Sequence, residues 1–205
     1  MSDRAAFESC VRAGGVALFP ADTLYGLACD PSSAEAIDRI RALKGRDEGK
    51  PSAVMFFEPL AMREVLSMSG PRTREAIGAL LPGPVTLVIA NPRRLYPLAC
   101  RDDPERLGVR LIEGLLAGAG LAVFQTSANR SGEPPPSRFD AVDPAISDGA
   151  DLAIDGGELG GAPSTVVDVT GLEAGGWSVL REGALPASSV EAALRATGPA
   201  AGSRA

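Results

Sequence analysis

Short apolar runs typical of β-strands alternate with helical segments along the whole chain, and this alternation most limits the possible folds. The run VALFP at 16–20 is dense in apolar residues, whereas Ile37, Ile40 and Leu43 recur at helical spacing. Because strands and helices interleave without a repeat, we predict an α/β protein with a twisted, mixed parallel and antiparallel sheet flanked by helices. The expected strands lie at 16–20, 53–57, 85–90, 107–111, 121–126, 151–155, 165–170 and 177–181.

Capping and breaking residues predict the ends of the helices. Ser2 is placed to cap a first helix, which the glycines at 14–15 end. Ser32 and Glu35 have the spacing of a capping box at the start of the second helix. Further helices are expected at 58–68, 71–81 and 187–196.

A single domain over residues 1–205 is expected, with a core of about 14–186 and a frayed tail at about 197–205. The Pro-rich patch at 132–136 is too short to separate two domains. No apolar run reaches the length of a membrane span, and the N-terminus lacks the apolar region of a signal peptide. We therefore expect a cytoplasmic protein with no membrane partner.

The chain contains no histidine, which excludes Ser-His-Asp and Cys-His catalysis as well as HExxH zinc sites. Cys10, Cys29 and Cys100 are odd in number and far apart, so we expect free, buried thiols. The formal net charge of -6 argues against a general nucleic-acid coat but allows a local basic cavity. Any chemistry therefore depends on cations, carboxylates, hydroxyls, backbone amides or a metal held by oxygen ligands.

Several loops at strand ends carry groups that hold anions. In open α/β sheets ligands bind beyond the strand ends, so we expect these loops to converge on one basic cavity. Glycine-rich backbone at 155–165 adds N–H groups and Arg181 adds a cation, a combination typical of a polyphosphate site. The other side chains concerned are Thr23, Lys44, Arg46, Lys50, Thr86, Ser127, Asn129 and Ser131.

The stretch KGRDEGKP at 44–51 is the most basic of these loops. Lys44 supplies a mobile point charge and Arg46 a planar, bidentate fork, which suits nucleotide phosphates. Taken alone, such a stretch is commonly the solvent-exposed end of a helix. TSAN at 126–129, taken alone, is commonly a turn whose side-chain hydroxyls form hydrogen bonds with the local backbone. The chain has neither GxxxxGK[ST] nor GxGxxG after a strand, so it is not a P-loop or Rossmann protein by motif.

The order of seven such segments resembles the YrdC/Sua5 family of threonylcarbamoyl-AMP synthases, over about residues 14–186. Each motif alone is weak, but seven in register are strong. The segments are GGVALFPADTLYGLACDP, IRALKGRDEGKP, LLPGPVTLVI, LGVRL, TSANRSGEP, DGGELGGAPSTVVDVT and LREGALP.

This resemblance implies a single-domain YrdC-like fold and a nucleotidyltransferase of the short bacterial form. The enzyme would use L-threonine, bicarbonate or CO2, and ATP with Mg2+, and would release pyrophosphate and threonylcarbamoyl-AMP. The product would pass to a tRNA-modifying threonylcarbamoyl transferase complex for the t6A modification. Direct binding of tRNA or double-stranded RNA remains open.

The resemblance also implies the roles of individual residues. The catalytic set is Lys44, Arg46, Ser127 and Asn129, which also bind ATP together with Ser137 and Arg181. The threonine site is Thr23, Thr86 and Ser164, and Lys50 and Arg110 are further candidates. No metal ligand is assigned to the protein.

This chain departs from the family pattern at three places. Ala21 replaces a hydroxyl residue, the segment after Arg110 is short, and Pro135 replaces a serine, which leaves Ser137 as the nucleotide candidate. There are two alternatives to the synthase function. A non-catalytic, YciO-like RNA- or nucleotide-binding protein tends to lose the catalytic set, which is intact here. Carbamoyltransferases of the hydrogenase-maturation or antibiotic-tailoring kind usually carry this module inside longer chains.

Overall fold

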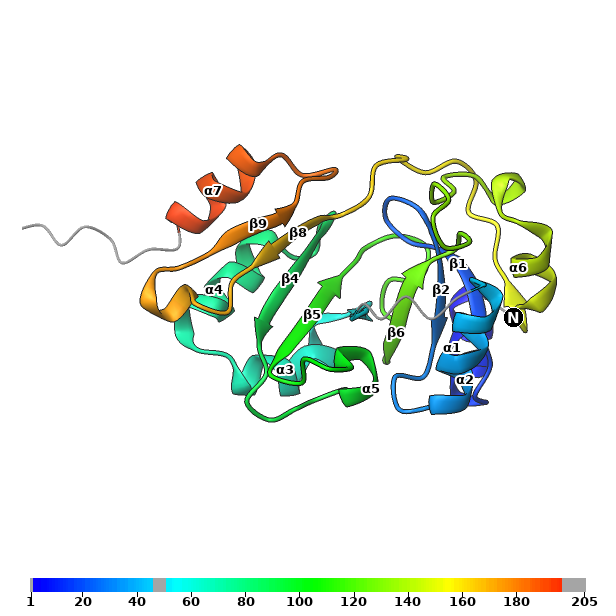
Figure 1. Cartoon of the computed structure of the whole chain (residues 1–205), viewed down its shortest axis with the longest axis horizontal. Helices are drawn as coiled ribbons and strands as arrows, with labels where there is room; N and C mark the ends of the chain where they lie inside the picture. The colour runs from blue at the N-terminus through cyan, green and yellow to red at the C-terminus, as the bar shows by residue number, and fades with distance from the viewer. Residues whose placement is uncertain (1, 46–50, 197–205) are drawn as a thin grey trace, which may run out of the picture.

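The computed structural model describes residues 2–45 and 51–196, and the strands in these residues form one nine-stranded sheet (Figure 1). The strands are β1 (Ala17–Pro20), β2 (Tyr25–Cys29), β3 (Ala53–Phe56), β4 (Val85–Ala90), β5 (Arg106–Leu111), β6 (Ala122–Ser127), β7 (Leu152–Ala153), β8 (Thr165–Asp168) and β9 (Ser178–Arg181). The α-helices are α1 (Asp3–Arg12), α2 (Ala34–Leu43), α3 (Arg63–Met68), α4 (Pro71–Leu80), α5 (Pro97–Cys100), α6 (Pro144–Gly149) and α7 (Ala187–Ala196). The 3-10 helices are η1 (Pro59–Met62), η2 (Phe139–Ala141) and η3 (Leu172–Ala174).

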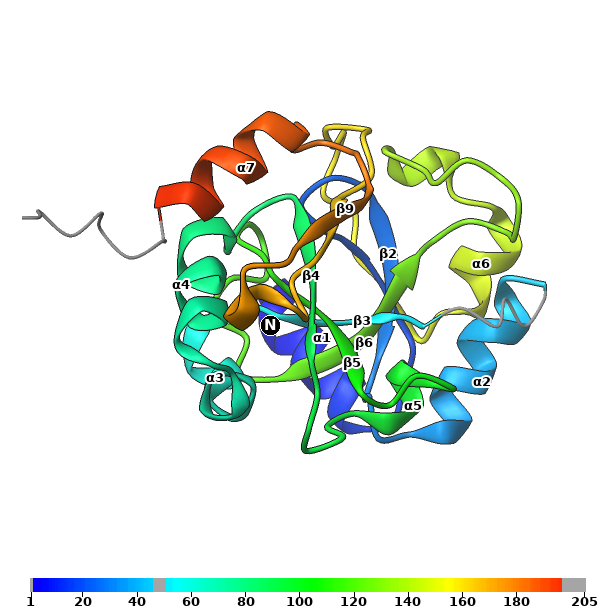
Figure 2. The same ribbon diagram turned by 60° about the vertical axis from the view of Figure 1, so that its left-hand side comes forward.

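The sheet order is β7-β1-β2-β6-β3-β5-β4-β8-β9, and the sheet is mixed. β1 pairs with β7, β3 with β5 and β4 with β8 in parallel, whereas the other neighbours are antiparallel. Figure 2 shows the twist of the strands across the sheet. The predicted α/β class with a mixed sheet is therefore confirmed. The single-domain assignment stays a prediction, and the predicted tail at 197–205 lies outside the described residues.

Each expected apolar run contains a strand, but β2, α5 and α6 are not among the expected strands and helices. β2 follows β1 after only four residues, Ala21 to Leu24, and all five of its residues are buried. No strand was expected at YGLAC, which follows the loop that carries Thr23. The expected helix at 58–68 is divided into η1 and α3.

The helix caps agree with the sequence at α1 and differ by one residue at α2. Ser2 accepts a hydrogen bond from the N–H of Ala5, as expected. At α2 the cap is Ser33, which accepts from the N–H of Ala36, and not Ser32. Ser32 instead donates its N–H and hydroxyl to Oδ1 of Asp30, at 2.7 and 2.6 Å. The aspartate turn uses Ser32 and so moves the cap along by one residue.

Two apolar clusters cover the faces of the sheet unequally. The larger cluster packs inward residues such as Leu87 of β4 and Val109 of β5 against α2, α3, α4 and α7. The smaller cluster lies on the opposite face, where α1 covers β1, β2, β3 and β6 through Phe7 and Val11. In Figure 1, α1 lies beside β1 and β2, whereas α4 and α7 lie at the other end of the sheet. The second face of β4, β5 and β8 is therefore left open.

None of the helices in the described residues has the length and apolarity needed to cross a bilayer. Within the same residues, all three cysteines are free thiols. Cys29 and Cys100 are buried as expected, whereas Cys10 is only partly buried. Burial raises the pKa of Cys29 to about 12, so this thiol stays protonated at neutral pH.

Candidate active site

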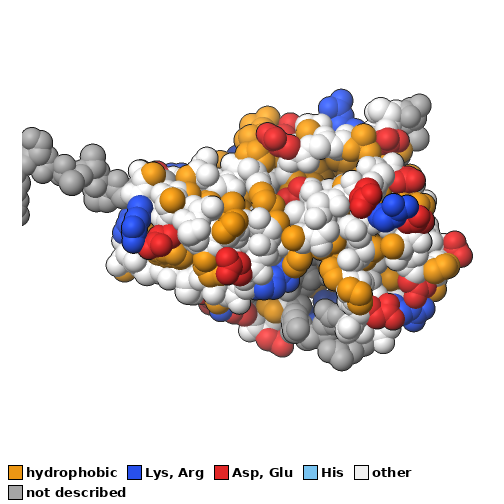
Figure 3. Space-filling model, turned by 90° about the horizontal axis from the view of Figure 1, so that it is seen from above, with side chains coloured by type: hydrophobic (Ala, Val, Ile, Leu, Met, Phe, Trp, Pro, Cys, Tyr) orange, Lys and Arg blue, Asp and Glu red, His pale blue; other side chains and the backbone are white. Residues whose placement is uncertain are grey.

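A cavity of about 550 Å3 occupies the open face of the sheet and the adjacent loops. The space-filling view from above shows a hollow in this surface with blue cationic side chains at it (Figure 3). The cavity therefore extends over the sheet face as well as beyond the strand ends. Among the predicted site residues, those that line it are Thr23, Thr86, Arg110, Ser127, Ser164 and Arg181.

Alternate residues of two strands form the floor of the cavity. Arg106, Gly108 and Arg110 of β5 point to the open face because successive side chains of a strand alternate between its two faces. Thr86 and Val88 of β4 do the same next to them. Gly108 leaves room above the sheet, since the nearest atom to an added Cβ would be 3.4 Å away. A small residue at the centre and long cations at both ends give the floor its shape.

Lys44, Ser127 and Asn129 meet at one wall of the cavity. Lys44 is the C-terminal cap of α2 and is only 5% exposed. Its Nζ donates to the carbonyl oxygens of Ser127 and Asn129, at 2.6 and 2.8 Å. The hydroxyl of Ser127 donates to Oδ1 of Asn129 at 2.5 Å. The ammonium thus binds the turn that presents Ser127 to the cavity.

This cluster contains three of the four residues predicted to be catalytic. Ser127 lines the cavity, and Lys44 and Asn129 lie behind it. Arg46 and Lys50 lie outside the described residues, so their predicted roles stay predictions. Pro51, the first described residue after that gap, lines the cavity.

Thr86, Ser164 and Arg181 form the opposite wall. The hydroxyls of Thr86 and Ser164 are 3.0 Å apart, and both residues are buried. The guanidinium of Arg181 donates to the carbonyl oxygen of Ser164 at 2.7 Å. This wall combines two hydroxyls with a cation, a set that can bind a polar, anionic ligand.

Arg110 lies between these walls as a nearly buried cation. Its side chain is 6% exposed and forms an ion pair with Asp22, whose side chain is 17% exposed. Nε of Arg110 and Oδ2 of Asp22 are buried without a hydrogen-bond partner. Burial, together with the nearby charge of Arg110, lowers the pKa of Arg181. Arg110 therefore lies in the cavity with a hydrogen-bond donor unused.

The remaining predicted residues differ in position. Thr23 is buried in the cavity wall, and its carbonyl oxygen accepts from the N–H of Gly161 at 3.0 Å. Ser137 is absent from the described lining of the cavity, and its carbonyl oxygen accepts from the N–H of Leu159 at 2.8 Å. A nucleotide contact by Ser137 therefore stays a prediction.

Sequence reasoning missed two charged residues that line the cavity, Arg106 and Asp103. Arg106 pairs with Asp168 at 2.5 Å and with Asp103 at 3.5 Å, and Arg106 and Asp103 line the cavity. A signal was present, because Arg106 is four residues before Arg110 on one strand and therefore shares its face. Tyr25, also missed, lines the same cavity.

No group of three or more Cys, Asp or Glu side chains in the described parts of the chain is placed to hold a metal ion. Asp103, which lines the cavity, and Asp22, which contacts the cavity residue Arg110, are each paired with an arginine. These residues do not fit a protein-held metal centre.

Comparison with known proteins gives a consistent result. The model of the Sua5_yciO_yrdC family, described as "Telomere recombination", matches residues 9–183. A threonylcarbamoyl-AMP synthase of Thiobacillus denitrificans is 32% identical over 169 residues, which cover 78% of this chain and 87% of that protein. The similarity therefore extends over most of both chains.

Solved structures have the same fold. P. abyssi Sua5 complexed with L-threonine matches 93% of this chain with a TM-score of 0.79 and 28% identity. This chain covers 56% of that protein, a little over half of its length. E. coli YciO matches 91% of this chain with a TM-score of 0.78, but its 23% identity shows the fold alone.

Proposed function

Since the chain belongs to the Sua5/YciO/YrdC family, we propose that it is a threonylcarbamoyl-AMP synthase. One structural observation supports the proposal in addition to membership of this family. Ser127, held by Lys44 and Asn129, faces the same cavity as the Thr86, Ser164 and Arg181 wall. A cavity with hydroxyls and cations on two walls suits a small amino acid beside a polyphosphate.

The proposed reaction joins L-threonine, bicarbonate or CO2, and ATP. The threonine amine attacks CO2, an N–C bond forms, and the amine loses a proton to give a carbamate. A carbamate oxygen then attacks the α-phosphorus of ATP, and the bond from that phosphorus to the bridging oxygen breaks. Pyrophosphate leaves with the electron pair, and threonylcarbamoyl-AMP remains. Nucleophile and leaving group are both anions, so the reaction depends on positioning and charge neutralisation more than on acid-base catalysis.

We assign the described residues to these steps according to the wall of the cavity on which each one lies. Lys44, Ser127 and Asn129 would bind the phosphates and the nascent carbamate, and Arg46, outside the described residues, would join them. Thr23, Thr86 and Ser164 serve threonine. Arg181 and Arg110 supply positive charge in a partly buried cavity, where charge interactions are stronger than in water. Lys50 and Ser137 remain candidates for ATP.

Mg2+ is the expected counter-ion of ATP, and we assign it no protein ligand because the described carboxylates form no metal-binding cluster. We further propose that the product passes to a tRNA-modifying threonylcarbamoyl transferase complex, and that the enzyme acts in the cytoplasm. The net charge of -6 makes extensive direct contact with tRNA unfavourable.

The decisive experiment incubates the purified protein with threonine, bicarbonate, Mg2+ and ATP. Mass spectrometry should detect threonylcarbamoyl-AMP, and pyrophosphate should be released in step with it. Omitting threonine should abolish both signals. Tight binding of nucleotide or RNA without turnover would instead favour the YciO-like alternative.

A further inference from the structure

Residues 155–163, here called the strap, cross from the β1–β7 end of the sheet to the β8–β9 end. In Figure 1 the yellow chain after α6 passes along the top of the molecule and enters β8. The strap ends at Pro163, which lines the cavity, and the next residue is Ser164. The position of Ser164 in the cavity therefore depends on how the strap is held.

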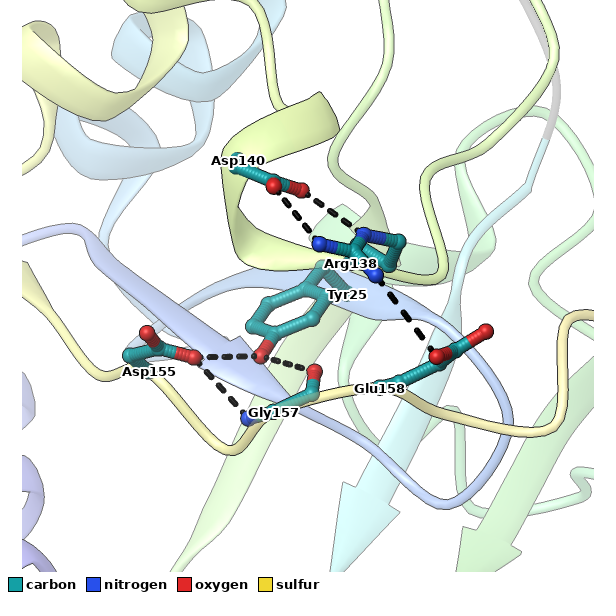
Figure 4. Close-up of polar contacts among 6 residues, drawn as sticks. All are labelled: Tyr25, Arg138, Asp140, Asp155, Gly157 and Glu158. Carbon is teal, nitrogen blue, oxygen red and sulfur yellow. Dashed lines mark hydrogen bonds and ion pairs between the residues drawn. The ribbon is translucent and has the colours of Figure 1, made fainter.

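The hydroxyl of Tyr25 holds the beginning of the strap (Figure 4). It accepts from the N–H of Gly156 at 2.9 Å and lies 2.8 Å from the carbonyl oxygen of Gly157. Oδ1 of Asp155 is 3.2 Å from the same hydroxyl and accepts from the N–H of Gly157. Burial raises the pKa of Tyr25, so the hydroxyl keeps its proton for donation at neutral pH.

Further bonds continue the attachment along the strap. Leu159 donates its N–H to Ser137, and Gly161 donates its N–H to the carbonyl oxygen of Thr23, which lines the cavity. Arg138 pairs with Glu158 at 3.6 Å, as Figure 4 also shows. The strap thus touches two residues of the proposed threonine site, Thr23 through Gly161 and Ser164 through the chain itself.

The backbone of Tyr25 holds a different part of the cavity. Its carbonyl oxygen accepts from the N–H of Ala128, between Ser127 and Asn129. Its N–H donates to the carbonyl oxygen of Pro136. These bonds need no hydroxyl, and the ring packs on Phe139 with centroids 5.8 Å apart. Replacing the tyrosine by phenylalanine therefore removes the bonds to the strap but keeps the backbone bonds to the wall formed by Lys44, Ser127 and Asn129, here called the Lys44 wall.

We propose that Tyr25 is a positioning residue for threonine: its hydroxyl fixes the strap and thereby sets Thr23 and Ser164 for the amino acid. The inference rests on the proposed function. It assigns the hydroxyl no contact with the reacting atoms. Because the Lys44 wall is held by the backbone of Tyr25, ATP binding does not depend on the hydroxyl.

The test compares Tyr25→Phe with Tyr96→Phe, which removes the hydroxyl of the chain's other tyrosine. Tyr96 lies outside the described lining of this cavity and packs on Phe56. We expect Tyr25→Phe to raise the KM and the calorimetric Kd for threonine by about fivefold, the scale of one or two lost hydrogen bonds. KM for ATP and kcat should change less than about twofold, and Tyr96→Phe should leave all four values unchanged.

Variants of Asp155 supply a second readout. Asp155→Asn keeps an oxygen acceptor for the Gly157 N–H, whereas Asp155→Ala removes it. We therefore expect Asp155→Asn to retain most of the threonine affinity and Asp155→Ala to lose it in the same way as Tyr25→Phe. The double variant with Tyr25→Phe should be less than additive, because both changes release one attachment. Hydrogen exchange of the peptide covering 155–161 should accelerate in Tyr25→Phe and not in Tyr96→Phe.

The outcomes distinguish a failure of this inference from a failure of the proposed function. Unchanged threonine affinity and unchanged exchange in Tyr25→Phe would overturn the inference while the wild-type protein still forms the adenylate. A parallel loss of ATP and threonine affinity would assign the hydroxyl a general structural role and would also overturn it. A wild-type protein that binds threonine but makes no adenylate would refute the proposed function alone, and the Kd ratio would still decide the inference. A wild-type protein that binds no threonine would overturn both.

Discussion

Lys44 joins two segments that are more than eighty residues apart in the sequence. Its ammonium carries three N–H donors and reaches the carbonyl oxygens of Ser127 and Asn129, which neutral side chains of similar length would hold less strongly. It therefore contributes both a positive charge near the cavity and the shape of the turn that presents Ser127. We expect these two contributions to be separable by substitution.

Lys44→Ala should reduce adenylate formation by about 100-fold or more, since it removes a charge-stabilising group and releases the turn. Lys44→Arg keeps the charge, but its planar fork matches two backbone carbonyls less well, so we expect intermediate activity. Pyrophosphate release measures both effects. Arg41→Ala on the same helix is the control, because its ion pair with Asp38 is on the surface and contributes little. Wild-type rates in Lys44→Ala would contradict the assignment.

At the scale of elements, local patterns predicted more than long-range contacts did. The strand at 85–90 and the helix at 187–196 have the predicted bounds, because apolar density and helical spacing are local properties. The capping box at Ser32 was wrong by one residue, since the Asp30 turn competes for that serine. The expected cavity residues Thr86 and Ser164 meet as hydroxyl partners, yet their pairing depends on the alignment of β4 with β8. Arg106 was missed because it directly precedes the LGVRL motif, and its place on the cavity face follows only from the alternation of side chains along β5.

On β5, the proposed function requires a small residue at the centre of the cavity floor. Gly108 has ordinary backbone geometry, and an added Cβ would meet only normal contacts with Ala53 and Thr86. Gly108→Val should therefore fold, since β-branched residues suit strands, but its methyl groups would fill the cavity floor. We expect activity to fall by at least about tenfold with the melting temperature retained.

Gly78→Ala in α4 is the matched control, because an added Cβ there meets nothing within 4 Å. Alanine is favoured over glycine inside a helix by about 1 kcal/mol, so this variant should be more stable and equally active. Thermal unfolding and adenylate formation are measured for both variants. A fully active Gly108→Val would show that substrates do not lie over this part of the sheet.

At the scale of the whole molecule, Asp151 joins α2 to the edge of the sheet. Its carboxylate pairs with Arg39 at 2.9 Å and accepts from the N–H of Val16 at 2.7 Å. The hydrogen bond from Arg39, followed by that from Val16, lowers the pKa of Asp151. The ionised form is therefore favoured in the folded state. Its stabilisation is present above the unfolded pKa and is lost as the pH falls toward the lower, folded value.

Asp151→Asn should therefore unfold at a lower temperature than the wild-type protein at neutral pH. The difference should shrink as the pH falls below about 4, near the ordinary pKa of aspartate. Calorimetry across this range gives the comparison. Asp38→Asn, a change at an exposed carboxylate, should alter stability by less than about 0.5 kcal/mol. A difference between Asp151→Asn and wild type that stays constant with pH would contradict this account.

The unequal covering of the two faces of the sheet affects which substitutions this protein can accept. The strands under the cavity are packed from beneath by the larger apolar cluster, so replacing a side chain on their upper surface removes none of this apolar packing. Substitutions there that leave the Arg110–Asp22 ion pair in place can alter what is bound while this packing is kept. A scaffold of this kind permits new specificities to arise on one surface while the other preserves the architecture.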